Sequence, residues 1–171
     1  MIPVFETVRL QIYEASMDML ASERSELLLS IPPLLTSAVV ANLPPYFSGI
    51  DSKATAHAWL ERMLRDSRLF LVKSKSDVLI GFLFASSEKG HDAHIGYLLS
   101  EDTWGKGFGT ELLQGFIEYV PQSTTWDKLI GGVSQDNAAS AHLLKKLGFV
   151  EQPGRSGNVV FYEYTVPRQL S

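Results

Sequence analysis

The 171-residue sequence contains no cysteine. This absence excludes disulfides, zinc–thiolate sites and any mechanism that forms a covalent intermediate on cysteine. The sequence also lacks an apolar run long enough to cross a bilayer, and Met1-Ile2-Pro3-Val4 lacks the basic start of a secretory signal peptide. We therefore expect a cytoplasmic protein without a membrane partner.

A basic excess is missing as well. Lys and Arg together number 15 against 19 Asp and Glu, so the formal net charge is −4. Nucleic acid is not favoured as a partner, because proteins that bind it carry clustered basic residues. Hydrophobic residues make up 45% of the chain, which is enough for a packed core and too much for a disordered protein. The length predicts one domain over residues 1–171, and no repeat or linker is visible.

Hydrophobic periodicity predicts the element order β-α-α-β-β-β-α-β-α-β. Strand-like patterns cover residues 7–13, 69–72, 78–86, 93–100, 128–134 and 158–166. Helical apolar spacing covers residues 17–29, 56–64, 108–120 and 136–149. The order indicates an α+β (mixed α/β) protein whose middle strands form an antiparallel meander.

Three local signals give sharper expectations. Val8, Leu10 and Ile12 alternate with polar residues, so they should share the buried face of the first strand. Pro32-Pro33 should end the first helix, because proline removes a hydrogen bond and clashes with the preceding turn. Asp136 suits the N-cap of the last helix, because a short side chain with an acceptor oxygen is favoured there.

The stretch TWGKGFGTELL, residues 103–113, places Gly105, Gly107 and Gly109 directly before a helical pattern. Glycine lowers helix stability by about 1 kcal/mol relative to alanine, so we expect a function that requires an unobstructed backbone. A strand followed by glycines and a helix N-terminus is an arrangement that binds anions. The spacing excludes a Walker A loop and a dinucleotide fingerprint. Taken alone, the stretch is also compatible with a plain glycine-rich turn.

A second stretch, DNAASAHLLKKLGF at residues 136–149, lies one strand downstream. Together the two stretches resemble the GCN5-related N-acetyltransferase (GNAT) family, whose loop runs Arg/Gln-x-x-Gly-x-Gly/Ala. Trp104 stands at the first position, as is common in the ribosomal-protein N-terminal acetyltransferase (RimJ/RimL-like) subgroup, which the sequence resembles most. The later helix of the family starts with Asn and ends in Leu-Gly-Phe, matched here by Asn137 and residues 147–149. The resemblance covers nearly the whole chain.

The resemblance implies the acyl-CoA N-acyltransferase fold, with a central, mostly antiparallel, splayed sheet flanked by helices. It implies acetyl-CoA as the acyl donor. No metal site is expected, because the spacing of His91 and His94 would point them to opposite faces of a strand. Backbone N–H groups of one continuous segment would hold the CoA pyrophosphate: Trp104, Gly105, Lys106, Gly107, Phe108, Gly109 and Thr110. The thioester carbonyl would lie against backbone N–H groups near Leu98 and Leu99. Lys106 would add charge near the phosphates or is a solvated surface lysine.

The catalytic groups implied by the resemblance depart from the family pattern. His94 stands where many relatives carry Glu, so it is either the base or a half-buried structural histidine. Leu144 replaces the Tyr that protonates the CoA sulfur in many members. Asn137 and Ser140 match an Asn-x-x-Ser pattern that would bond the pantetheine arm or the sulfur. Alternatively, Asn137 caps its own helix and Ser140 is an ordinary first-turn serine.

Without cysteine or a Gly-x-Ser-x-Gly elbow, direct attack by the amine in a ternary complex is the economical mechanism. Weak base machinery favours acceptors of low pKa, because an α-amine is roughly 10–20% neutral at pH 7 and a lysine amine under about 0.1%. Peptide N-termini and small amines both qualify. Tyr46 and Phe47, in the loop of residues 44–50, either line the acceptor site or serve packing.

Two other classes of function stay open on the sequence. Because His94 and Leu144 depart from the family, the chain is compatible with an acyl-CoA-binding sensor or partner module that has lost turnover. A nucleotide-phosphate binder unrelated to CoA is the third candidate. The acceptor, the physiological acyl chain and the oligomeric state, a homodimer included, are not specified by the sequence.

Overall fold

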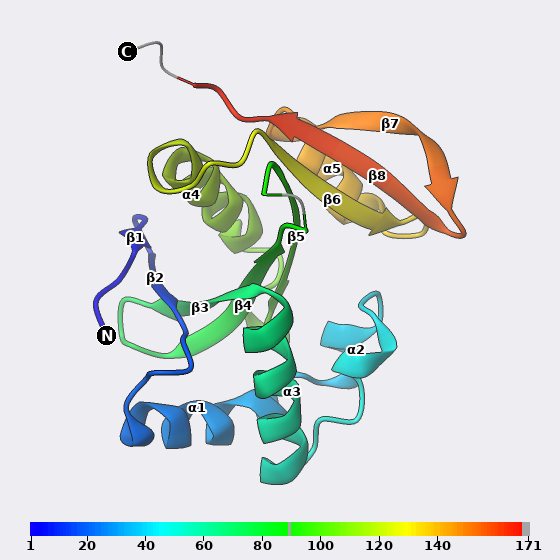
Figure 1. Ribbon diagram of the computed structural model, residues 1–171. Coiled ribbons are helices and arrows are strands. Elements are labelled where there is room, and N and C mark those ends of the chain that lie inside the picture. The colour runs from blue at the N-terminus through cyan, green and yellow to red at the C-terminus, as the bar shows by residue number, and fades with distance from the viewer. Residues whose placement is uncertain (89, 169–171) are drawn as a thin grey trace. The chain divides into compact units, whose positions relative to one another are not determined.

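The computed structural model describes residues 1–88 and 90–168. The chain divides into two compact units, the first made of residues 1–84 and 97–106 and the second of residues 85–96 and 107–171. Hydrogen bonding orders the strands as β1-β2-β3-β4-β5-β6-β8-β7 (Figure 1). The β1–β2, β2–β3, β6–β8 and β7–β8 pairs are antiparallel and β5–β6 is parallel. The predicted mixed α/β fold with a mostly antiparallel sheet is confirmed.

The first unit holds the N-terminal elements and the end of the central strand. Its strands are β1 (Phe5–Glu6), β2 (Leu10–Glu14), β3 (Arg68–Ser74) and most of β4 (Leu79–Ser86). Its helices are α1 (Ala21–Leu34), α2 (Ser37–Val40) and α3 (Lys53–Asp66), with 3-10 turns η1 (Pro45–Phe47) and η2 (Glu101–Thr103). Strand β5 (Asp92–Leu99) belongs to both units, because its last three residues lie in the first.

One apolar core joins these elements. The buried residues of α3 are Ala56, Trp59, Leu60 and Met63, whose spacing puts them on a single helix face. They pack in one cluster with α1, η1, β3, β4 and the end of β5. Phe47, Phe82 and Leu98 belong to that cluster and are 0%, 0% and 4% exposed. The loop that carries Phe47 and the end of β5 therefore share a core.

The second unit contains the remaining elements. They are α4 (Phe108–Ser123), β6 (Lys128–Ser134), α5 (Ala138–Lys146), β7 (Val150–Ser156) and β8 (Val159–Thr165). The face of α4 that carries Leu112, Phe116 and Val120 is fully buried. The parallel ladder between β5 and β6 runs only from Asp92↔Lys128 to Ile95↔Gly131. The pairing of β5 with β6 therefore stops halfway along β5.

The expected end of the first helix was wrong. Helix α1 continues through Pro32-Pro33 to Leu34, and the Leu35 N–H still donates to the Ile31 carbonyl at 3.1 Å. The prolines lie in the last turn, where few helical bonds remain to be lost. Ile31 and Leu34 are 0% and 5% exposed, so core packing holds this turn helical.

The expected first strand was too long. Val8 is 89% exposed, and β2 begins only at Leu10. Thr7 closes a turn before it, because the Thr7 N–H donates to the Leu10 carbonyl at 2.9 Å and its Oγ1 accepts from the Leu10 N–H at 3.1 Å. Leu10 and Ile12 are fully buried as expected.

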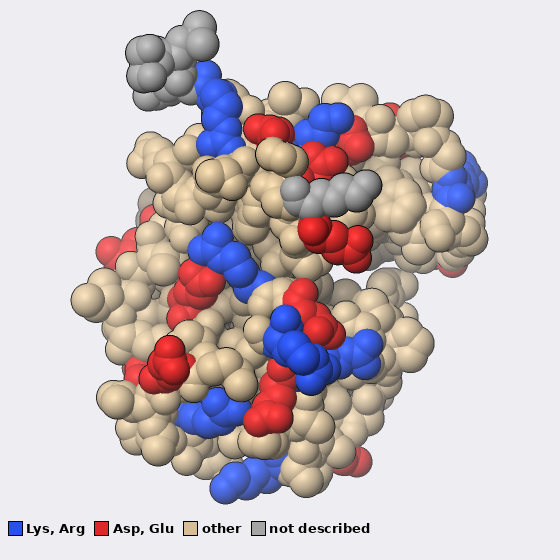
Figure 2. All heavy atoms as spheres, viewed as in Figure 1, with Lys and Arg blue, Asp and Glu red and all other residues tan. Residues whose placement is uncertain are grey.

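The surface carries mixed charge. Figure 2 shows acidic and basic side chains interspersed over the visible face, without a broad patch of one sign.

Within residues 1–88 and 90–168, no helix combines the length and apolar character that a membrane span requires.

Replacement of Ser52 by alanine should destabilise the first unit. Ser52 is the N-cap of α3, where its Oγ accepts from the Thr55 N–H at 3.1 Å and the Thr55 Oγ1 accepts from the Ser52 N–H at 3.0 Å. Loss of such a cap costs about 1 kcal/mol, which lowers the Tm of a chain of this size by about 2–4 °C. Calorimetry of Ser52→Ala would measure this shift. Ser25→Ala, at an exposed position within α1, is the control and should not lower the Tm.

Candidate functional site

The glycine loop connects β5 and η2 to α4. Gly105 has φ +72° and Gly107, the N-cap of α4, has φ +82°. Both values lie in the left-handed region, which glycine adopts readily and other residues rarely adopt. Gly109 lies in the first turn of α4 without a positive φ. The backbone itself therefore requires the first two glycines of the loop.

The N-terminus of α4 has no side-chain cap. Its first backbone bond runs from the Glu111 N–H to the Gly107 carbonyl at 3.1 Å, so the N–H groups before Glu111 point beyond the helix end. A Cβ on Gly105 would have no atom of the described structure within 4 Å. An open backbone at the positive end of a 16-residue helix fits a pyrophosphate such as that of CoA.

Trp104 ties the loop to the end of β5. Its indole Nε1 donates to the Leu99 carbonyl at 2.9 Å, while the side chain is half exposed. The hydroxyl of buried Thr103 donates to the Ser100 carbonyl at 2.7 Å. Sequence reasoning considered only the backbone of Trp104 and missed this contact.

Gly81 sets the separation of β4 and β5. A Cβ at Gly81 would overlap the Leu98 carbonyl oxygen and lie 2.8 Å from the Leu99 Cδ2. The Ser100 N–H donates to the Ile80 carbonyl at 2.8 Å and holds the two strands together beside this point. The close approach leaves no room for a side chain. The sequence did carry a signal, because a lone glycine inside a strand pattern marks a close backbone approach.

His94 lies in the half of β5 that pairs with β6, opposite Ile130. Its side chain is exposed rather than half-buried, and it has no ion pair within the described chain. His91 is also exposed, and its Nδ1 lies 3.4 Å from the Asp127 carboxylate. Among the residues that the structure describes, no group of three His, Asp or Glu could hold a metal ion.

Asn137, not Asp136, caps α5. Its Oδ1 accepts from the Ser140 N–H at 3.3 Å, and its own N–H donates to the Ser134 carbonyl at 2.8 Å. That turn brings Asn137 to the helix start and leaves Asp136 outside it. The capping interpretation of Asn137 is thus confirmed, and Ser140 is partly buried in the same first turn.

Leu144 takes no polar part in the site. It is 5% exposed, and a Cβ on Gly131 would lie 2.9 Å from its Cδ1. The side chain therefore packs tightly on β6 at the position where many relatives carry an acid.

The acceptor-loop residues have different environments. Tyr46 is 37% exposed, whereas Phe47 is fully buried with its ring 5.7 Å from Trp59. The Thr36 hydroxyl at the start of α2 donates to the Glu101 carboxylate of η2 at 2.6 Å. Phe47 and Leu98 thus share one core within the first unit, and the Thr36–Glu101 bond joins α2 to η2 in the same unit.

Comparison with known protein families identifies the family of this chain. Residues 34–150 match the acetyltransferase (GNAT) domain. This span includes the glycine loop, α5 and the Leu-Gly-Phe sequence that follows α5. The chain belongs to the GNAT acetyltransferase family. Acetyl-CoA is the acyl donor of this family, and the uncapped N-terminus of α4 fits its pyrophosphate.

A curated relative covers only part of the chain. An uncharacterized N-acetyltransferase, p20 of Bacillus licheniformis, is 33% identical over 89 residues, which are 50% of this chain and 49% of that protein. The match therefore spans about half the length of the curated relative.

Solved structures of the same fold cover nearly the whole chain. RimL, a ribosomal L7/L12 alpha-N-protein acetyltransferase in complex with CoA, has a TM-score of 0.73 at 19% identity, over 96% of this chain and 97% of that one. Spermidine N-acetyltransferase from Vibrio cholerae, with CoA and spermine, has a TM-score of 0.71 at 16% identity, over 92% and 95%. A GNAT acetyltransferase from Bacillus anthracis has a TM-score of 0.72 at 16% identity, over 94% and 96%. At these identities the similarity shows the fold alone.

A valine at position 107 should abolish tight binding of acetyl-CoA. It would place a branched side chain at the uncapped N-terminus of α4 and strain a left-handed residue. Isothermal titration of Gly107→Val with acetyl-CoA would measure the loss. Gly157→Val is the matched control, because Gly157 has φ +60° in the turn between β7 and β8. If both variants lose affinity equally, general strain and not the loop explains the effect.

Proposed function

We propose that this protein transfers the acetyl group of acetyl-CoA to a primary amine by direct attack in a ternary complex. The observation that carries the proposal is the uncapped α4 N-terminus, reached through two left-handed glycines, in a chain of the GNAT family. We also propose that it is a cytoplasmic member of the RimJ/RimL-like subgroup, because the sequence starts without the basic residues of a signal peptide and carries Trp104 at the first position of the loop pattern.

The donor is held by backbone groups in this proposal. The N–H groups of Gly105 to Thr110 bind the pyrophosphate, and exposed Lys106 adds positive charge nearby. The Trp104 N–H, which was expected in this set, instead donates to the Glu101 carbonyl at 3.1 Å. The backbone near Leu98 and Leu99 donates to the thioester carbonyl oxygen. Hydrogen bonds that strengthen as negative charge develops on that oxygen lower the barrier to acyl transfer.

The transfer forms one bond and breaks one. The neutral amine nitrogen attacks the carbonyl carbon, the C–S bond breaks, and CoA leaves as the thiolate, which then takes a proton from solvent. The amine loses one proton, which exposed His94 accepts directly or through water. Asn137 and Ser140, at the first turn of α5, contact the pantetheine arm or the sulfur.

The acceptor is a peptide N-terminus or a small amine. An α-amine is roughly 10–20% neutral at pH 7 and needs less help from a base than a lysine amine does. Tyr46 and the loop around it line the acceptor site, with Phe47 supporting that loop from within the core. RimL and the spermidine enzyme show that both acceptor types occur among proteins of this fold.

A catalytically weak acyl-CoA-binding sensor is the second candidate. Leu144 favours it, because a buried leucine occupies the position of the sulfur-protonating residue of many relatives. Such a protein would bind acetyl-CoA without releasing CoA in the presence of amines.

Thermal shift and CoA release together test the proposal. Acetyl-CoA and CoA at about 100 times their Kd should add about 2.7 kcal/mol of native-state stability and raise the Tm by several degrees, whereas ATP should not. CoA release should then depend on an added amine. Binding without release would favour the sensor, and the absence of any shift with either CoA species would contradict both.

Alanine at position 81 should impair transfer more than binding of free CoA. A new Cβ would push the Leu98 backbone away and misplace a donor to the thioester oxygen, for which a loss of about 10²-fold in kcat is typical. The affinity for acetyl-CoA should fall, while that for CoA, which lacks the thioester carbonyl, should not. Infrared difference spectra of the bound thioester carbonyl would report the lost hydrogen bond.

A matched variant separates this effect from general destabilisation. Ile12→Val removes one buried methylene from β2, which β3 separates from β4, and lowers stability by about 0.5–1.5 kcal/mol. Ile12→Val should leave the ratio of the affinities for acetyl-CoA and for CoA unchanged. An unchanged ratio in Gly81→Ala as well would show that Gly81 serves the fold alone.

A further inference from the structure

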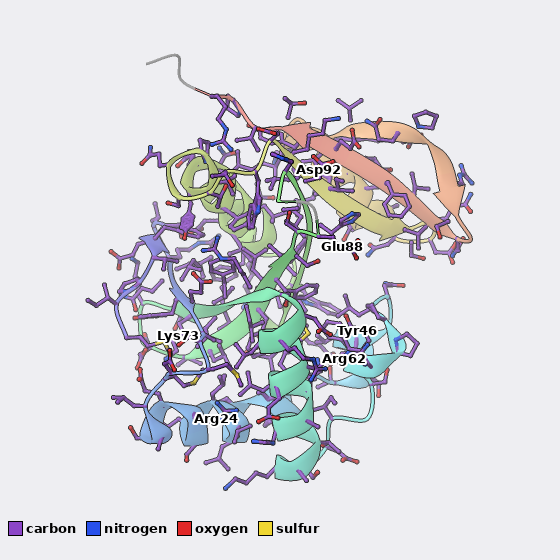
Figure 3. All side chains as sticks on the ribbon, in the orientation of Figure 1. Arg24, Tyr46, Arg62, Lys73, Glu88 and Asp92 are labelled. Atoms are coloured by element: carbon purple, nitrogen blue, oxygen red, sulfur yellow. The ribbon has the colours of Figure 1, made fainter. Side chains whose placement is uncertain are left out.

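The guanidinium of Arg62 lies over the ring of Tyr46, with Cζ 3.7 Å from the ring centroid. Figure 3 shows the two side chains meeting between α3, which carries Arg62, and the η1 loop, which carries Tyr46. The separation is that of a stacked pair, in which the flat guanidinium rests on an aromatic face. Both side chains reach solvent, with 47% of Arg62 exposed.

The stacked pair is anchored to the core of the first unit. Tyr46 and Phe47 have ring centroids 4.9 Å apart, and Phe47 lies 5.3 Å from Phe84 of β4 and 5.7 Å from Trp59 of α3. Phe47 shares its buried cluster with Leu98, the residue expected beside the thioester. The position of the guanidinium is therefore fixed within the unit that carries the end of β5.

The outer nitrogens of Arg62 are available to a ligand. Within the described chain its one charged contact runs from Nε to the Asp66 Oδ2 at 3.8 Å, which exceeds hydrogen-bond length. The neighbouring carboxylate of Glu61 is directed elsewhere, with Oε1 3.5 Å from the Arg24 Nη2 and 3.4 Å from the His57 Nε2. A guanidinium whose outer nitrogens have no carboxylate partner can bind a ligand carboxylate through two parallel hydrogen bonds.

We propose that Arg62, held flat by Tyr46, binds an anionic group of the acceptor. This inference rests on the proposed function. The acceptor class is then an amine with a carboxylate near the reactive nitrogen, either a free amino acid or a peptide whose N-terminus is followed by an acidic side chain. The visible face in Figure 2 shows no broad patch of one sign, so one oriented guanidinium supplies the discrimination. Polyamines are disfavoured, because a second cation would approach a fixed positive charge.

Matched acceptors test the inference through CoA release. The peptides Ala-Asp-Ala-amide and Ala-Asn-Ala-amide differ only in one charge, as do alanine and alaninamide apart from their amine pKa, so rates are compared per neutral amine. Wild-type protein should prefer the charged member of at least one pair by about tenfold in kcat/KM, since a hydrogen bond to a charged group has that effect. A preference within the peptide pair alone would identify a peptide as the acceptor, and a preference within the alanine pair alone would identify a free amino acid. Spermidine should be a poor acceptor.

Variants of the same helix separate specificity from stability. Arg62→Gln should bring the kcat/KM ratio of charged to uncharged acceptor to about one without changing the affinity for acetyl-CoA. Tyr46→Leu should lower the same ratio, because the guanidinium is no longer held in place. Arg65→Gln is the control, because Arg65 lies one turn away, is 68% exposed and also pairs with Asp66, at 3.2 Å. It should keep the wild-type preference. Thermal melts would verify that each variant is folded.

The outcomes distinguish this inference from the proposed function. CoA release at equal rates with charged and uncharged acceptors, or an equal preference in Arg62→Gln and Arg65→Gln, would overturn the inference and leave the acetyltransferase intact. A clear preference for spermidine would also overturn the inference and leave the acetyltransferase proposal intact. No release with any amine would overturn both.

Discussion

The parallel ladder that joins β5 to β6 ends partway along β5, and the backbone that we propose to hold the thioester lies beyond that end. From Asp92 to Ile95 the strand is bonded in parallel to β6, and its last residues are pressed onto β4, where Gly81 provides the room. Backbone N–H and C=O groups must find partners, and the Ser100 N–H just after the strand finds one in the Ile80 carbonyl at 2.8 Å. In the proposed reaction a backbone N–H near Leu98 and Leu99 would donate to the thioester carbonyl, so that role would require no particular side chain.

Most elements of the fold could be predicted from the sequence, because their apolar periodicity agrees with the tertiary structure. The strand at 128–134 and the buried stripe of α4 follow the pattern directly. Three local expectations failed: core packing overrode one, a local turn overrode another, and the N-cap of α5 is Asn137 in place of Asp136. Core contacts of Ile31 and Leu34 keep α1 helical through its prolines, and a turn at Thr7 leaves Val8 in solvent.

The backbone of the candidate loop could be anticipated from the sequence, whereas the side-chain contacts around it could not. The glycine spacing identified the loop, because an open left-handed backbone is visible in one short stretch of sequence. The bond from the Trp104 indole to Leu99, the overlap that excludes a Cβ at Gly81 and the stacking of Arg62 on Tyr46 were missed. The Arg62–Tyr46 pair joins two segments that meet only in the folded chain, and periodicity contains no information about such a pair. The lone glycine in a strand pattern was the one available signal for the close approach at Gly81.

The three tryptophans of the chain have very different exposure. Trp59 and Trp126 are 2% and 7% exposed, whereas Trp104 is 49% exposed and stands at the start of the glycine loop. Its emission should therefore lie at longer wavelength than that of the other two and should be quenched selectively by a small solute. The protein thus contains its own optical reporter, placed where the acyl donor is expected to bind.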